Sequence, residues 1–110
     1  GKTEAGEEVE INRAAAESDL VIYLNLNLVP MNGGHKSVGI GLCSGRTINA
    51  NHNPYTLTEP GTYMDPADSP LHRSLERIGR FIESKIDVFH TESVINNRMF
   101  DRNLEFLAKN

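Results

Sequence analysis

The stretch that decides the fold is LVIYLNLNLV, residues 20–29. Its first half is an unbroken apolar run, which is typical of a strand that is covered on both faces. Its second half alternates leucine with asparagine, so the leucines are expected on one side of the strand and the asparagines on the other. Pro30 has no backbone N–H to donate and ends the strand. The stretch therefore predicts a long strand within a sheet.

The clearest helix lies farther along the chain, after Ser69 and Pro70, which suit the N-cap and the first helical turn. Its apolar residues recur at helical spacing and form one stripe: Leu71, Leu75, Ile78, Ile82 and Ile86. A second strand is expected over residues 87–95. Because two parallel strands need a crossover connection, we predict that the helix at about residues 70–85 packs against a parallel sheet.

Shorter elements surround these three. Asn12 is expected to cap a helix over residues 13–17, and residues 35–42 favour a helix with Val38 and Leu42 on one face. Residues 44–68 are rich in Gly, Pro, Asn and Asp and indicate mostly loop. A last helix is expected after its cap at Asp101, with Leu104, Leu107 and Ala108 inside. The order of elements predicts an α/β fold, a parallel sheet with flanking helices.

The composition narrows the class of protein. A chain of 110 residues corresponds to one domain or part of one. The net charge of −4, without a basic run longer than a pair, argues against a nucleic-acid surface. No apolar stretch is long enough to span a membrane. Cys43 is the only cysteine, so an internal disulfide is impossible and a reduced, cytoplasmic setting is expected. Residues 1–8 are acidic and predict an exposed lead-in, and the missing initial Met indicates an excised or processed piece.

A glycine pair and a lysine follow the first strand, in Gly33-Gly34-His35-Lys36. In open α/β sheets, ligands bind beyond the carboxyl ends of the strands. The glycines could expose backbone N–H groups there, and a helix that begins near His35 adds the positive end of its dipole, which suits a phosphate. Lys36 could pair with that phosphate or act as a nucleophile. The alternative, an exposed lysine in a glycine turn, is about equally supported. The string is not a P-loop, because the earlier glycine of that motif is missing.

His52 is the candidate metal ligand. It lies between asparagines and before Pro54, so a turn is expected. Imidazole is the commonest metal ligand, although a loop histidine is more often simply exposed. The four histidines show no close pair at zinc-like spacing, so a metal site built by the protein alone is not expected.

Other polar residues have structural interpretations. His72 is expected to be a polar residue of the first helical turn. His90 and Glu92 lie on one face of the second strand, where they could pair with each other. The arginines and a glutamate on the helix predict a solvated face with ion pairs three and four residues apart: Arg73, Glu76, Arg77 and Arg80.

Taken together, these segments resemble the lactate racemase family, whose members use a nickel-pincer nucleotide. Ile11-Asn12-Arg13-Ala14 and the turn from Glu17 into Leu20-Val21-Ile22 are similar to the family's Asn-Arg start and its acidic turn into a strand. Gly33-Gly34-His35-Lys36 is similar to the Gly-Gly-x-Lys of the cofactor loop, and His52 stands where the family places a nickel ligand. Ser69-Pro70-Leu71-His72 resembles the segment before the family's next strand. The resemblance covers about residues 9–97.

The resemblance implies a chemistry for these residues. In the family, the lysine is joined covalently to a pyridinium-3,5-bisthiocarboxylic acid mononucleotide that carries nickel, and one histidine also binds the metal. The pyridinium takes a hydride from C2 of a 2-hydroxy acid and returns it to either face. Lys36 would be the attachment residue and His52 the nickel ligand. The family's Pro-His pair, whose histidine is a general acid/base, is Pro30-Met31 here, which leaves His35 as the nearby substitute.

The resemblance further implies that residues 1–110 are one segment of a larger cofactor-holding domain. Its partners would be a small 2-hydroxy acid, the cofactor-synthesis proteins and the rest of the full-length chain. The alternative is a non-catalytic α/β module of the same ancestry that binds a nucleotide, a phosphate or a partner protein. We expect Lys36 and His52 to face one shared cavity, and the isolated chain to bind nickel weakly and to be inactive.

Overall fold

The computed structural model describes residues 1–28, 32–58, 65 and 67–95. Two strands and five helices are present in this part of the chain. Their bounds are α1 Arg13–Ala16, β1 Val21–Asn27, α2 Gly34–Leu42, α3 Gly45–Asn51, α4 Pro54–Thr58, α5 Pro70–Glu83 and β2 Val88–Val94. The two strands and the helices α1, α2 and α5 were all predicted from the sequence. The helix expected after Asp101 lies outside the described residues.

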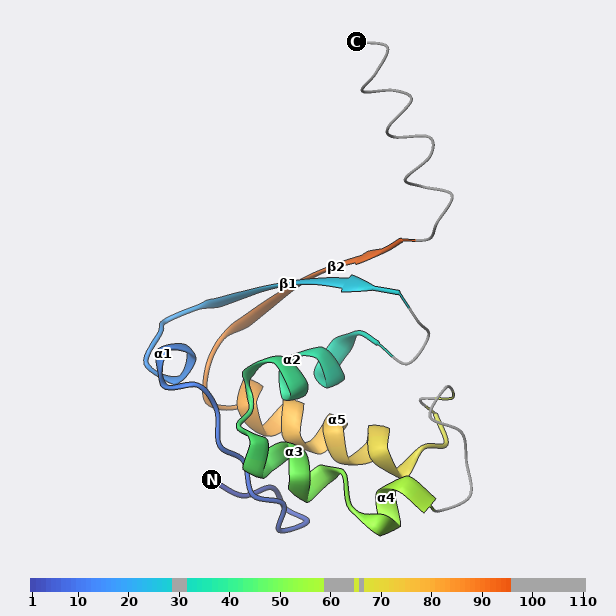
Figure 1. Cartoon of the computed structure of the whole chain (residues 1–110). Helices are drawn as coiled ribbons and strands as arrows, with labels where there is room; N and C mark the ends of the chain where they lie inside the picture. The colour runs from blue at the N-terminus through green and yellow to red at the C-terminus, as the bar shows by residue number, and fades with distance from the viewer. Residues whose placement is uncertain (29–31, 59–64, 66, 96–110) are drawn as a thin grey trace, which may run out of the picture.

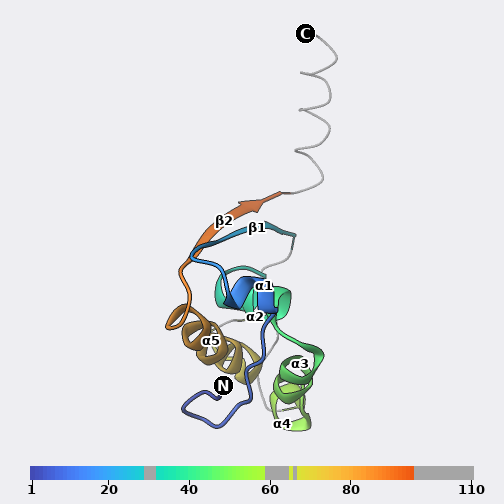
Figure 2. The ribbon, with the colours of Figure 1, turned by 90° about the vertical axis from the view of Figure 1, so that its left-hand side faces the viewer.

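The two strands form a parallel sheet, as predicted. Val21 pairs with Val88, and the register continues to Asn27 opposite Val94. The helices α2 and α5 pack against each other below one face of this sheet, and α3 and α4 lie farther from it, against α5 (Figures 1 and 2). The α/β prediction is therefore confirmed. None of the described helices has both the length and the apolar character that crossing a membrane requires.

Only one face of the sheet is covered by described residues, so the expectation of a strand covered on both faces is wrong for this part of the chain. We define the outer face as the side without a described helix, and the covered face as the side toward α2. The outer face carries Ile22, Leu24, Leu26, Phe89, Thr91 and Ser93. Ile22 is 61% exposed and Leu24 is 73% exposed. The alternation sends each leucine of β1 outward, because successive side chains of a strand point to opposite faces.

The covered face changes character along the strands. Its first residues, Val21, Tyr23 and Val88, are half-buried, and the last two pack against the core. Its last residues are polar, with Asn25 and Asn27 on β1 and Glu92 on β2. The sheet therefore meets the core at one end and presents hydrogen-bonding groups to α2 at the other.

The core lies mainly between α2 and α5. Ser69 caps α5 by accepting a hydrogen bond from the His72 N–H, and Pro70 begins the helix, as predicted. The predicted stripe is buried from Leu71 to Ile82, whereas Ile86 is half-buried beyond the end of the helix. Val38 of α2 is fully buried against this stripe. Burial of one such aliphatic side chain contributes roughly 1.5–3 kcal/mol, so this helix pair is the main source of stability.

The prediction that residues 44–68 are mostly loop is wrong, because two short helices occupy residues 45–58. Asn53 and Thr56 cap α4 reciprocally: Asn53 Oδ1 accepts from the Thr56 N–H at 3.1 Å, and Thr56 Oγ1 accepts from the Asn53 N–H at 3.1 Å. Pro54 stands at the first helical position, where its missing N–H costs nothing. The Asn-Pro pair that suggested a turn is in fact a helix start.

The acidic start of the chain is mostly exposed, as its composition predicted, but it is also anchored to the rest of the fold. Thr3 and Val9 are buried, and Lys2 forms an antiparallel bridge with Glu8. Glu7 forms a bidentate ion pair with Arg77 of α5, at 2.5 and 3.0 Å. The partner lies 70 residues away, so the local sequence did not reveal this anchor.

Candidate functional site

The glycine pair makes a turn with a backbone conformation that other residues rarely adopt. Gly33 has a φ of 106° and Gly34 a φ of 56°, and both lie in the region that favours glycine. Gly33 also has no room for a side chain, because a Cβ there would lie 2.7 Å from Glu92 Oε2. This turn leads directly into α2, just beyond the carboxyl end of β1. The glycine turn therefore lies between the first strand and a helix, as the sequence predicted, and its role as a binding site stays a prediction.

A network of polar side chains from both strands and from α2 holds the glycine turn in place. Asn25 Nδ2 donates to Asn27 Oδ1 at 2.6 Å and to Ser37 Oγ at 2.8 Å. Asn27 Nδ2 donates to Glu92 at 2.9 Å, and Glu92 accepts a further bond from the Gly34 N–H at 2.7 Å. The sequence interpretation missed this role. The signal was the Leu-Asn alternation, whose asparagines lie toward α2 rather than toward solvent.

Lys36 lies in the first turn of α2. Its Nζ donates to Asn32 Oδ1 at 2.7 Å, across the glycine turn. Burial lowers the pKa of Lys36 below the ordinary value for lysine. A lowered pKa increases the fraction of neutral amine, which is the nucleophilic form. Lys36 is therefore partly buried and hydrogen-bonded rather than freely solvated, and its reactivity stays a prediction.

A hollow of about 230 Å³ adjoins this lysine. Its lining combines the glycine turn with four basic groups, one leucine and one glutamate: Gly33, Gly34, His35, Lys36, His72, Arg73, Leu75 and Glu76. His72, expected to be only a polar first-turn residue, is therefore part of this lining. Basic groups beside a helix N-terminus form an environment that suits an anion.

The side chain of His35 points toward α5 and β2. Its Nδ1 lies 2.6 Å from a carboxylate oxygen of Glu76, and its Nε2 lies 2.9 Å from one of Glu83. Burial acts to lower the pKa of His35, but the hydrogen bonds to the two carboxylates outweigh burial and raise it above the ordinary value. The ring can come this close because residue 79 is glycine, where a Cβ would lie 2.3 Å from the His35 Cβ.

His90 extends the same cluster. Its Nε2 lies 2.7 Å from Glu83, which therefore joins two imidazoles. Burial acts to raise the pKa of Glu83, but the bonds to His35 and His90 bring it below the ordinary value. The expected pairing of His90 with Glu92 is wrong, because each has a different partner. Glu83 lies between the imidazoles across the helix–strand packing, a contact that strand periodicity cannot show.

His52 stands apart from this group. It is the exposed C-cap of α3, and its Nδ1 lies 3.0 Å from the Ile48 carbonyl oxygen of its own helix. The hollow beside Lys36 does not include His52 in its lining, so the shared cavity stays a prediction. Within the part of the chain that the structure describes, no three His, Cys, Asp or Glu residues are placed to hold a metal ion.

One comparison with known proteins bears directly on this site. The family model described as the lactate racemase N-terminal domain matches residues 1–65. The match spans more than half of the chain and includes β1, the glycine turn, Lys36 and His52. The chain belongs to the lactate racemase N-terminal domain family. No curated protein matches the chain.

Most hydrogen-bond partners of His35 and Gly34 come from the part of this lactate racemase-family chain that follows the match. Glu76 and Glu83 come from α5, and His90 and Glu92 from β2. The matched segment thus carries the candidate attachment and ligand residues, and the following segment holds His35 and the glycine turn beside them. Pro30-Met31, where the chain differs from the family's Pro-His pair, lies outside the described residues.

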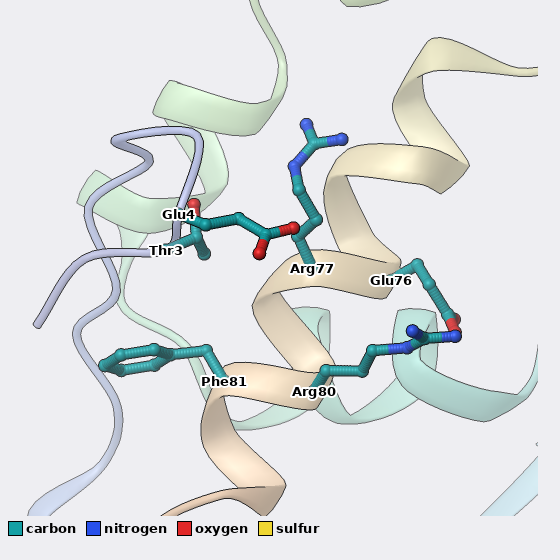
Figure 3. Close-up of a pocket in the computed structure, with 6 residues that line it drawn as sticks. All are labelled: Thr3, Glu4, Glu76, Arg77, Arg80 and Phe81. Atoms are coloured by element: carbon teal, nitrogen blue, oxygen red, sulfur yellow. The ribbon is translucent and has the colours of Figure 1, made fainter.

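A further hollow, of about 340 Å³, lies beside α5 near the chain start (Figure 3). Its arginines already have acidic partners. Arg77 is paired with Glu7, and Arg80 Nε donates to Glu76 at 2.9 Å, a pair four residues apart as predicted. Figure 3 shows Arg80 turned toward Glu76.

Proposed function

We propose that the chain is the cofactor-attachment segment of a nickel-pincer 2-hydroxy acid racemase or epimerase homologue. The observation that carries the proposal is the placement of Lys36. A lysine with a lowered pKa lies in the first turn of a helix, after a glycine turn and beyond the carboxyl end of a parallel strand. The family match over this segment supports the same conclusion.

The residues present fit the nickel-containing cofactor of the family. Lys36 offers an amine for covalent attachment, and the basic groups beside it suit the nucleotide phosphate. His52 offers an exposed imidazole as a nickel donor. When bound, the cofactor supplies the hydride acceptor for C2 of the substrate. The protein groups bind and orient it, which is the usual division of work in cofactor enzymes.

His35 is our candidate for the group that exchanges a proton with the substrate hydroxyl. Both ring nitrogens lie within hydrogen-bond distance of a carboxylate. These contacts favour the protonated imidazole, so His35 would act first as the acid that gives a proton to the substrate oxygen, and it could accept one only after losing its own. A histidine is required for this role elsewhere in the family, and Met31 cannot replace it chemically.

Intact-protein mass tests the attachment. The chain is co-expressed with the cofactor-synthesis proteins, purified and digested. We expect a covalent adduct that maps to Lys36 and is absent from Lys36→Arg. Lys85→Arg is the matched control, because Lys85 lies beyond the C-terminal end of α5 and the substitution should leave the adduct unchanged. A wild-type chain without adduct under conditions that load a known family member contradicts the proposal.

The basic hollow beside Lys36 also favours the second candidate function, a non-catalytic α/β module that binds a nucleotide or phosphate. The two candidate functions differ in how the ligand binds Lys36, because the cofactor would be attached covalently and a phosphate would bind reversibly. The module would bind inorganic phosphate reversibly and would leave the lysine unmodified after co-expression. Phosphate binding lost in Lys36→Ala, together with an unmodified wild-type chain, supports the module.

The setting of the segment is part of the same proposal. Residues 1–110 form one segment of a larger cofactor-holding domain, and the remaining chain supplies further substrate and acid/base groups. The lone Cys43, whose pKa burial raises to about 11, suits a reducing cytoplasm because it is neither paired nor reactive.

Nickel binding by the unmodified chain is expected to be weak, since His52 supplies one imidazole. Calorimetric titration with nickel, compared with His52→Ala, measures this.

A further inference from the structure

We propose that Glu92 is the positioning residue of the Lys36 site. Its carboxylate joins the ends of both strands to the first turn of α2 and thereby fixes where Lys36 points. The contribution to cofactor attachment rests on the proposed function. The positioning of Lys36 itself does not, and it can be measured without any cofactor.

The two oxygens of Glu92 bind two different parts of the fold. Oε1 accepts from the Gly34 N–H at 2.7 Å, and Oε2 accepts from Asn27 Nδ2 at 2.9 Å. Asn27 comes from β1, Glu92 from β2 and Gly34 from α2. One side chain thus ties three elements that meet at the carboxyl edge of the sheet.

A carboxylate suits this position better than any neutral group. The N–H groups at the start of a helix lack partners within the helix and carry the positive end of its dipole. A charged acceptor makes a stronger bond there than a neutral one. Both partners of Glu92 are donors, so both of its oxygens must accept. Glutamine offers one acceptor oxygen and would turn its NH₂ group toward the other donor.

The glycine turn and Glu92 also depend on each other sterically. A Cβ at residue 33 would lie 2.7 Å from Glu92 Oε2 and 3.0 Å from Asn27 Nδ2. Gly33 therefore allows the carboxylate to approach the backbone, in addition to providing the positive φ. This requirement explains why a small residue stands directly before the helix.

Lys36 is two residues after the N–H that Glu92 binds. On the other side, its Nζ is held by Asn32 Oδ1, so the first turn of α2 is fixed at two points. Release of the Glu92 contact leaves the turn with the side-chain bond from Lys36 to Asn32 and the longer bond from the Gly33 N–H to Ser37 Oγ at 3.2 Å. A frayed first turn exposes Lys36 and removes the partial burial that shapes its reactivity.

The test compares Glu92→Ala and Glu92→Gln with the wild-type chain, and uses Ser93→Ala as the matched control. Ser93 is the next residue of β2 and lies on the outer face. Competitive acetylation of the lysines is followed by peptide mass spectrometry between about pH 7 and 11. We expect the labelling midpoint of Lys36 to rise in Glu92→Ala toward the ordinary lysine value of about 10.4, with a smaller rise in Glu92→Gln and none in Ser93→Ala.

Amide exchange of Gly34 gives an independent readout. We expect exchange about tenfold faster in Glu92→Ala, which corresponds to loss of one hydrogen bond. If Glu92→Ala does not fold, NMR of the Gly34 amide decides. Its chemical shift should change with pH as a carboxyl group titrates in the wild-type chain, and this change should be absent in Glu92→Gln. A purely structural Glu92 would lower the melting temperature and leave the Lys36 midpoint unchanged, and that result overturns the inference.

Co-expression with the cofactor-synthesis proteins separates this inference from the proposed function. We expect the adduct on Lys36 to fall at least about tenfold in Glu92→Ala, because small misplacements of a reacting group have large effects. A wild-type chain without adduct defeats the proposed function, and the acetylation result still decides the role of Glu92. Equal adduct in wild type and Glu92→Ala overturns that role.

Discussion

The two faces of the small sheet differ in a way that reverses the usual pattern. The outer face is apolar and exposed, with Leu24 73% accessible, whereas the covered face ends in Asn25, Asn27 and Glu92. In most half-covered sheets, the apolar side chains face the core and the polar ones face water. Here the polar end of the covered face holds the glycine turn, so its residues serve the site rather than the core.

Burial against the core and polar contacts with α2 are thus separated along the strands. The apolar start of the covered face meets the core through Tyr23 and Val88, and the polar end meets the first turn of α2. Most hydrophobic stability comes from the α2–α5 pair, in which Leu75, Ile78 and Ile82 are buried. Each of the following predictions measures one side of this comparison.

The largest effect is expected in the core beneath the covered face. Leu75 is 2% exposed and lies against Gly39 of α2, where a Cβ would be 3.3 Å from Leu75 Cδ2. Leu75→Ala should lower the free energy of unfolding by about 2–5 kcal/mol through lost burial and the resulting cavity. Urea melts measure this. A loss below about 0.5 kcal/mol would falsify the assignment of the core to this helix pair.

A substitution at the polar end of the covered face should lower the free energy of unfolding less than Leu75→Ala does, but by a measurable amount. Asn25→Ala removes the bonds to Asn27 and Ser37, and leaves the half-buried Ser37 hydroxyl with only the longer bond from the Gly33 N–H. We expect a loss of about 1–2 kcal/mol. Thr91→Ala on the outer face is the control and should be nearly neutral. Equal effects of the two variants in the same urea melts would remove the distinction between the faces.

The third prediction concerns pH and the His35 cluster beside the covered face. Because the folded pKa of His35 is raised, its contribution is complete below the unfolded value of about 6.5 and is lost as pH rises through the folded value. The stability difference between wild type and His35→Gln should therefore be roughly 1 kcal/mol near pH 6 and smaller near pH 9. Thermal melts at several pH values test it, and a difference that grows with pH contradicts it.

The smallest effect is expected on the outer face. Leu24→Ser should change the free energy of unfolding by less than about 0.5 kcal/mol, because the side chain is already in water. Binding of a hydrophobic dye should decrease at the same time, since the exposed apolar surface becomes smaller. A loss above about 1.5 kcal/mol would show that Leu24 packs against another part of the protein in solution.

The sequence predicted those parts of the site that depend on neighbours along the chain. The glycine turn before α2, the Ser69 cap and the stripe on α5 follow from local chemistry and helical periodicity. The two short helices after α2 were missed because their Gly, Pro and Asn residues, which act as caps and helix starts here, also favour loops. The role of His52 is still a prediction from family resemblance.

The sequence by itself determined the two strands and their parallel order, the helices α1, α2 and α5, and the position of Lys36 after a strand. Apolar periodicity and backbone restrictions are properties of neighbouring residues, so these features can be read from the chain alone. Only the tertiary structure decided which strand face α2 covers, and with it the partners of His35 and Gly34. Those partners lie 41 to 58 residues away, at Glu76, Glu83 and Glu92. A contact over that separation depends on how α5 and β2 pack, which no local pattern specifies.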